Sequence, residues 1–271
     1  MISDRHFHPQ LIIIIIKMYA RAVLQRFWNE FWQDLEENMD LQGWRKKFLL
    51  LQVNDALFPI GAYSHSYGLE TYRQKNLLTS LDDVWEFLYH RMCYSFCYNE
   101  FLSVRLAYEY AAAGQIQKIE ILDDLLEASR VPKETREAGH KLGSRFVKTV
   151  MGMDIPYESD VFQRYCGRCR DKTMAHSIVY GVFCAAAGIP YEDAMEHYLY
   201  AQTSSMITNC VKTIPLSQTD GQHLLYRSQE LFPELLDQVK GLTEDELCLS
   251  APGIDIRCMQ HEGLYSRIYM S

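Results

Sequence analysis

Helical periodicity runs through almost the whole of this chain and constrains its fold more than any other feature. Apolar residues recur every three to four positions, as in Val84, Leu88, Met92 and Phe96. Short alternating runs of β-branched residues, which are typical of strands, are scarce. Most of the eight prolines stand between periodic segments, where they do not interrupt a helix. The pattern therefore predicts an all-α protein, a single-domain bundle of about ten helices.

Capping signals divide this pattern into segments. Ser80, followed closely by two aspartates, predicts the start of a long helix that ends near Ala113, before Gly114. A shorter helix is expected near residues 66–76, and further helices are expected over residues 117–129, 132–151, 158–170, 173–187, 190–212, 217–240 and 244–249. We expect the tail, residues 252–271, to be irregular, with a short helix in its last ten residues that needs a surface to pack on.

Residues 1–40 differ in character from the rest, so we divide the chain into an N-terminal extension, 1–40, and a helical domain, 41–271. The extension holds the apolar run Leu11–Ile16 and then an aromatic, charged stretch, Tyr19–Glu37, with the composition of an amphipathic helix. Two explanations stay open. We favour an upstream start codon, with Met39 as the natural start and a loosely ordered segment before it. The other explanation is an arm that docks on a partner.

Charge and hydropathy argue against two classes of partner. The chain has 35 acidic and 27 basic residues, a net charge of −8, whereas binding to nucleic acid depends on Lys and Arg at the phosphates. The uncharged stretch Ile178–Ile189 has twelve residues, fewer than the roughly 20 of a membrane span. No clean cleavage pattern follows Leu11–Ile16, and the eight cysteines occur in a chain long enough to build a core. We therefore expect no nucleic acid, no membrane, reduced thiols and a cytoplasmic protein.

The pair Cys166 and Cys169 forms a CxxC motif, the clearest chemical motif of the chain. Such a pair is half of a zinc site or a thiol redox pair. No second CxxC completes a set of four ligands, and the strand-to-helix context of a redox motif is missing. The HExxH, phosphate-loop and GxSxG patterns are also absent from the sequence. We expect no catalytic residues, no metal site and no stably bound cofactor. The alternative is a thiol-dependent metal or redox-binding helical protein that uses Cys166 and Cys169.

Two other segments have features of contact surfaces. The helix predicted over 190–212 ends in Lys212, which is either a cation favoured by the helix dipole or a partner contact. The tail, 260–271, carries two tyrosines, a methionine and an arginine, types that are enriched at protein interfaces. It either docks on its own domain or becomes ordered against a partner.

Three segments share a pattern with a known family. Residues 51–70, LQVNDALFPIGAYSHSYGLE, match the signature P-[IV]-G-x-[YF]-x-x-S-x-G-L-E. Residues 198–225 and 259–267 carry further matching positions, and the segment 139–148 also fits. Together they resemble the UreF family of urease accessory proteins, over about residues 46–271. The extension 1–40 and the CxxC pair have no counterpart in the family pattern.

This resemblance implies a fold, a function and partners. Proteins of the family are all-α, lack catalytic activity and dimerise. They bind the accessory protein UreD, also called UreH, and recruit the GTPase UreG. The assembly delivers nickel to apo-urease, so that nickel is handled by the complex.

The resemblance also implies roles for individual residues. Four side chains match positions of the UreG-facing surface: Tyr63, Glu70, Tyr200 and Lys212. Arg267 matches a tail arginine needed to recruit UreG. An acidic and a basic side chain beside exposed tyrosines would form a contact surface. The rest of the tail matches the segment that becomes ordered on UreD/UreH, and the residues expected to bind there are His261, Glu262, Leu264, Tyr265, Ile268 and Tyr269.

Overall fold

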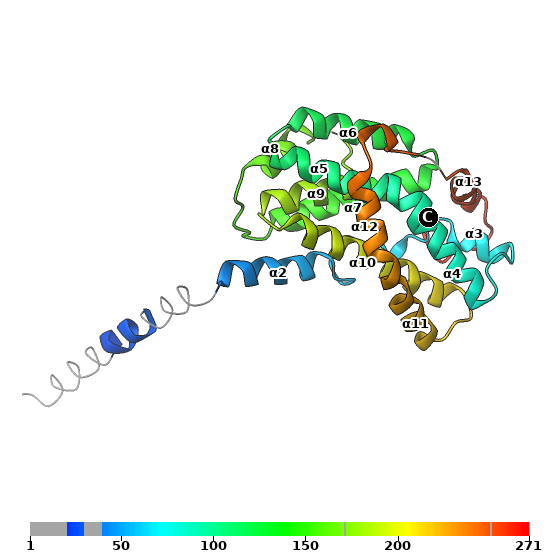
Figure 1. The fold of residues 1–271 in the computed structure, drawn as a ribbon, viewed down its shortest axis with the longest axis horizontal. Helices are drawn as coiled ribbons and strands as arrows, with labels where there is room; N and C mark the ends of the chain where they lie inside the picture. Colours follow the sequence, from blue (N-terminus) through cyan, green and yellow to red (C-terminus); the bar gives the residue numbers. More distant parts are fainter. Residues whose placement is uncertain (1–20, 30–39, 171, 250, 271) are drawn as a thin grey trace, which may run out of the picture. The chain divides into compact units, whose positions relative to one another are not determined.

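The computed structural model describes residues 21–29, 40–170, 172–249 and 251–270. The chain divides into two compact units, residues 1–48 and 49–271. In the first unit, residues 21–29 are helical, and Phe27 and Trp28 are exposed. Helix α2 (Leu41–Val53) contains the boundary between the units (Figure 1). The run Leu11–Ile16, Met39 and the larger part of the predicted amphipathic stretch lie outside the described residues.

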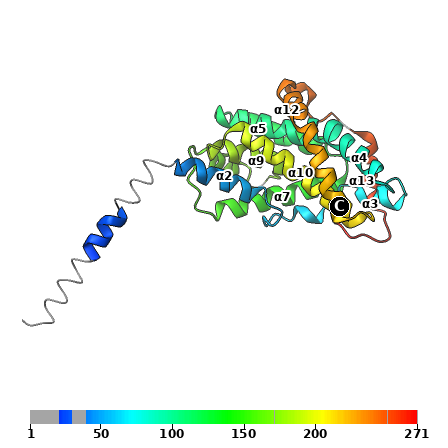
Figure 2. The same cartoon turned by 60° about the horizontal axis from the view of Figure 1, so that its bottom comes forward.

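The second unit is built from helices, and the described residues contain no strand (Figures 1 and 2). The predicted all-α fold class is therefore confirmed. None of the described helices combines the length and apolar character that a membrane crossing needs. After α2 the helices are α3 (Leu69–Gln74), α4 (Leu81–His90), α5 (Leu102–Ala112), α6 (Ile116–Ser129), α7 (Lys133–Met151), α8 (Val161–Arg168), α9 (His176–Ala186), α10 (Tyr191–Thr213), α11 (Gln218–Ser228), α12 (Phe232–Gly241) and α13 (Pro252–His261).

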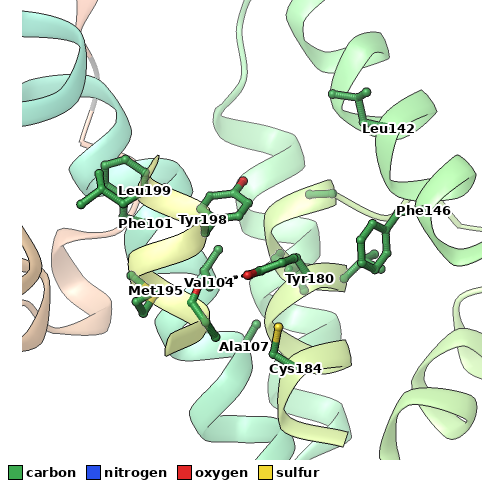
Figure 3. Close-up of a cluster of buried hydrophobic side chains, with 14 of the residues drawn as sticks. Phe101, Val104, Ala107, Leu142, Phe146, Tyr180, Cys184, Met195, Tyr198 and Leu199 are labelled. Atoms are coloured by element: carbon green, nitrogen blue, oxygen red, sulfur yellow. Dashed lines mark hydrogen bonds between the residues drawn. The ribbon is translucent and has the colours of Figure 1, made fainter. Parts of the chain in front are cut away.

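The core of this unit is centred on the contact of α5 with α9, and α10 packs against both. Gly181 of α9 permits the close approach, because a Cβ there would lie 2.5 Å from the carbonyl oxygen of Val104 in α5. Tyr180 and Tyr198 are buried with their ring centroids 4.8 Å apart (Figure 3). The Tyr180 hydroxyl donates to the carbonyl oxygen of Ala194, at 2.9 Å. This bond satisfies a polar group that would be costly to bury unpaired.

The long helix predicted to start at Ser80 is observed, with a change of winding in its middle. It begins with a reciprocal capping box, in which the Ser80 hydroxyl accepts from the backbone of Asp83 and the Asp83 carboxylate accepts from the backbone of Ser80. Between α4 and α5 the segment Arg91–Phe101 is π-helical. Apolar periodicity does not separate the two windings, because both keep one face of the helix on the core.

The prediction for the tail is wrong in its placement of the helix. The helical part is α13, whereas residues 262–270 are not helical. Pro252 stands in the first turn of α13 and Asp255 lies in its acidic first turn, both of which favour a helix start at that point. The last residues are instead held by contacts with other parts of the chain, which the next section describes.

Candidate functional site

The matched signature segment forms a compact turn that leads into α3. Gly61 and Gly68 have positive φ angles, 83° and 84°, which residues with a Cβ adopt only at a cost. At Gly68 a Cβ would also lie 3.0 Å from the backbone nitrogen of Cys258. The glycine therefore lets α13 pack directly on the signature segment, and Figures 1 and 2 show α3 beside α13.

Glu70, the last residue of the signature, is the centre of a buried polar cluster. The residue is 4 % exposed. One carboxylate oxygen accepts from the backbone nitrogen of Ile268, at 2.8 Å. The other accepts from the backbone nitrogen of Tyr269, at 3.0 Å, and faces His261 Nε2, at 2.9 Å. The carboxylate thus holds α13 and the tail to α3.

A second carboxylate, from Glu134 at the start of α7, completes the cluster. His261 is fully buried, and its Nδ1 lies 2.6 Å from Glu134 Oε2. Arg267 Nη1 donates to Glu134 Oε1, at 2.7 Å. Both ring nitrogens of His261 therefore face carboxylates. We call Glu70, Glu134, His261 and Arg267 the tail clasp.

Further bonds extend the attachment along the tail. Gln74 Nε2 donates to the carbonyl oxygen of Ser266, at 2.8 Å. The backbone nitrogen of Met270 donates to the carbonyl oxygen of Ser64, also at 2.8 Å. Tyr269 is buried. Of the two interpretations of the tail, the structure therefore shows the one in which the tail docks on its own domain.

The remaining tail residues that the sequence singled out point outward to different degrees. Tyr265 is 106 % exposed relative to the reference state and Ile268 is 76 % exposed. Glu262 is exposed and Leu264 is half-buried. The docked tail therefore presents apolar side chains on the surface beside the tail clasp.

Lys212 and Tyr200 are both exposed on α10, but they do not share a face. They are twelve positions apart, which corresponds to about 18 Å along the helix and about 120° around its axis. Lys212 precedes Thr213, whose carbonyl oxygen accepts from Arg73 Nε of α3 at 3.1 Å. The structure thus places Lys212 next to the signature region and Tyr200 about three turns away. The side chain of Tyr63 lies outside the described part of the chain.

The expectation that Glu70 lies with Lys212 on an exposed contact surface needs correction. With the tail in place, Glu70 is enclosed by α13 and residues 268–269, so it does not belong to an exposed surface. Contacts within its own chain explain why a glutamate stands at this position of the signature, because its carboxylate accepts from two tail amides and faces one imidazole. Any influence of Glu70 on a partner then passes through the tail.

The pair Cys166 and Cys169, on which the alternative interpretation depends, is buried at the end of α8. Burial raises the pKa of Cys166 to about 12 and that of Cys169 to about 11. The thiolates that bind metals or attack disulfides are therefore scarce at neutral pH. Among the described residues, no group of three or more His, Cys, Asp or Glu side chains has the arrangement of a metal site. The structure gives the thiol interpretation no support.

Sequence reasoning missed Glu134. It lies in the acidic first turn of α7, where a carboxylate ordinarily interacts favourably with the helix dipole. Its contact with His261 spans 127 positions of the sequence. No local pattern identifies such a partner.

In the described residues, a helical fold thus carries a polar cluster that fastens its own tail, and the tail displays Tyr265 and Ile268 outward. The UreF family model matches residues 78–229. The chain is 33 % identical over 224 residues to the urease accessory protein UreF of Bacillus sp. (strain TB-90), which covers 82 % of this chain and 97 % of that protein. It is also 33 % identical over 226 residues to the UreF of Lachnoclostridium phytofermentans, with the same shares of both chains. The chain belongs to the UreF family.

Proposed function

We propose that this protein is a scaffold for urease maturation, without catalytic activity of its own. It binds a UreD/UreH accessory protein and recruits the GTPase UreG, and the assembly inserts nickel into apo-urease. The observation that carries the proposal is the match to UreF proteins along 82 % of the chain. Nickel is the cargo of the complex and is not assigned to a site on this chain.

The surface around the tail clasp is the contact region we favour. Lys212 and Arg267 supply positive charge there, and Tyr265 and Ile268 supply exposed apolar area. Aromatic and arginine side chains at the centre of an interface contribute much of its binding energy. We assign UreG binding to Tyr63, Lys212 and Arg267 and, on a separate face of α10, to Tyr200, and we assign UreD/UreH binding to the outward side of the tail.

Glu70 and His261 have an indirect role in this proposal. Both are buried, so they do not contact a partner directly while the tail is docked. They position Arg267 and Tyr265 by fixing the two ends of residues 262–267. Glu70 therefore contributes to UreG recruitment as a positioning residue.

Light scattering after size-exclusion chromatography tests the proposal. The chain is co-expressed with the UreD/UreH protein of its organism, and UreG, GDP and magnesium are then added. We expect a joint complex that gains UreG. Lys212→Ala and Arg267→Ala should keep UreD/UreH and lose UreG, because charged groups at an interface mainly set partner choice and association rate.

Arg164→Ala is the matched control. Arg164 is an exposed arginine of α8 that pairs only with Asp160, at 3.5 Å, among the described residues. This variant should recruit UreG like the unchanged chain. If the unchanged chain elutes alone while both partner proteins are folded, the proposed scaffold function is refuted.

We further propose that the protein works in the cytoplasm and as a homodimer. The first is the setting that the cysteine usage predicts, and the second is what the family resemblance implies. The same light-scattering experiment on the isolated chain gives its oligomeric state.

A further inference from the structure

A buried arginine without a carboxylate partner lies behind the signature segment. Arg91 is 5 % exposed and stands at the first position of the π-helical segment. Among the described residues, no carboxylate lies within ion-pair distance of its guanidinium. Its carbon Cζ is 4.9 Å from the ring centroid of Phe96 and 5.8 Å from that of Tyr67. Aromatic faces stabilise a cation only partly, and a buried charge ordinarily has a full counter-charge.

The nearby acidic residue of α13 supplies only a weak counter-charge, from beyond ion-pair distance. Asp255 is close enough for the charge of Arg91 to act on it, but the pair is not in ion-pair contact. Burial raises the pKa of Asp255, and the opposing influence of Arg91 is the smaller of the two. A carboxyl group whose ionised form is itself disfavoured by burial is a weak counter-ion.

A small cavity adjoins Arg91 and is lined by groups that can donate hydrogen bonds. Its volume is about 20 Å³. The polar lining residues are Ser66, Arg91, Gln202, Ser205 and Asn209. Ser66 is 6 % exposed, and its hydroxyl has no hydrogen-bond partner among the described residues. A buried hydroxyl without a partner, beside a buried cation that makes no direct ion pair with a carboxylate, is a costly arrangement unless something accepts from both.

The size and chemistry of this cavity select its ligand. About 10–15 Å³ is enough to hold one water molecule, so the space of about 20 Å³ admits a small species such as a water molecule or a monatomic ion. Water would accept from Ser66 but would leave the charge of Arg91 uncompensated. A monatomic anion does both, because it neutralises the guanidinium and accepts from every donor around it.

We propose that this cavity is a binding site for one halide-sized anion, with chloride as the physiological ligand. The anion joins three elements: the signature segment through Ser66, the π-helical segment through Arg91, and α10 through Gln202 and Ser205. It also stabilises the strained backbone at Tyr67, whose φ of 50° is unusual for a residue with a side chain. The site is separate from the tail clasp and does not depend on the proposed urease function.

Urea unfolding of the full chain in sodium chloride and in sodium gluconate, at equal ionic strength, tests the site. A ligand that binds only the folded state shifts the folding equilibrium constant up to tenfold for each tenfold rise in concentration above its dissociation constant. We expect that shift with chloride and not with gluconate. Equal responses to the two salts overturn the proposal.

Three variants locate the effect. Ser66→Ala and Arg91→Gln should lose most of the chloride response, whereas the exposed control Arg164→Gln should keep it. A chloride response that Ser66→Ala leaves unchanged contradicts the assignment, even where Arg91→Gln fails to fold.

Crystals grown in sodium bromide provide an independent test. An anomalous peak within hydrogen-bonding distance of Arg91 and Ser66 supports the site, and water at that position without an anomalous signal overturns it.

Discussion

Replacing Glu70 with alanine should release the tail while leaving the helical core folded. The carboxylate accepts from the backbone nitrogens of Ile268 and Tyr269 and pairs with His261. The change deletes the acceptor for two amides and leaves the histidine with one carboxylate in place of two. A buried donor left without its acceptor costs about 1–3 kcal/mol, more than the roughly 0.5–1.5 kcal/mol that an ordinary hydrogen bond contributes.

Amide hydrogen exchange, measured residue by residue, reports this loss. At about 1.4 kcal/mol for each factor of ten, 1–3 kcal/mol corresponds to exchange that is about 5- to 140-fold faster. We expect the amides of Ile268 and Tyr269 to show it, and those of α9 to be much less affected. Glu70→Gln should have an intermediate effect, because its one amide oxygen can replace the bond to Ile268 but its NH₂ group cannot accept.

Glu262→Ala is the control for the charge of the tail, since Glu262 is exposed in the same region. Its exchange pattern should match that of the unchanged chain. If the amides of Ile268 and Tyr269 stay fully protected in Glu70→Ala, the buried ring of Tyr269 holds the tail by itself, and the clasp is not the cause of the attachment.

Three other predictions follow from buried groups. Burial lowers the pKa of His176 to about 4 and that of His65 to about 4. The unfolded chain therefore takes up protons that the folded chain refuses, and stability present above about pH 6.5 falls as the pH drops to about 4. At 1.36 kcal/mol per pKa unit, His176 accounts for about 3 kcal/mol of this loss. In urea unfolding at several pH values, the free energy of unfolding of His176→Phe should therefore fall by about 3 kcal/mol less than that of the unchanged chain. Gly68→Ala places a Cβ at positive φ against the backbone of α13. This change should destabilise the folded chain by about 1–2 kcal/mol or more, and thermal unfolding should show a correspondingly lower melting temperature. Because the thiols of Cys166 and Cys169 have raised pKa values, they should react with a disulfide reagent at pH 8 only after unfolding. Fast reaction in the folded chain would restore the thiol interpretation.

The predicted and observed helices agree where neighbouring residues determine the structure. Helices such as α6, α7, α9 and α10 lie within a few residues of the predicted ranges, because periodicity, prolines and caps act over neighbouring residues. The predicted helix 217–240 is instead split into α11 and α12 by a turn of 3-10 helix at Gln229–Leu231. The signature glycines also behave locally, since each occupies a turn that needs a positive φ.

The sequence alone pointed to Glu70 but assigned it to the wrong environment. Its bonds to Ile268 and Tyr269 span 198 and 199 positions, and no window of the sequence contains both ends. The same reason explains why Arg91 resembled any other arginine of a long helix. Whether a charge is buried depends on which distant segments cover it.

The sequence by itself therefore determined the helical elements, the fold class and the family of this protein, because these follow from residue order over short distances. The tertiary structure alone decided that Glu70 binds the tail rather than facing outward, that the CxxC thiols are enclosed, and that Arg91 lies beside a polar cavity. Each of these depends on burial, which arises only when segments far apart in the chain pack together and exclude water.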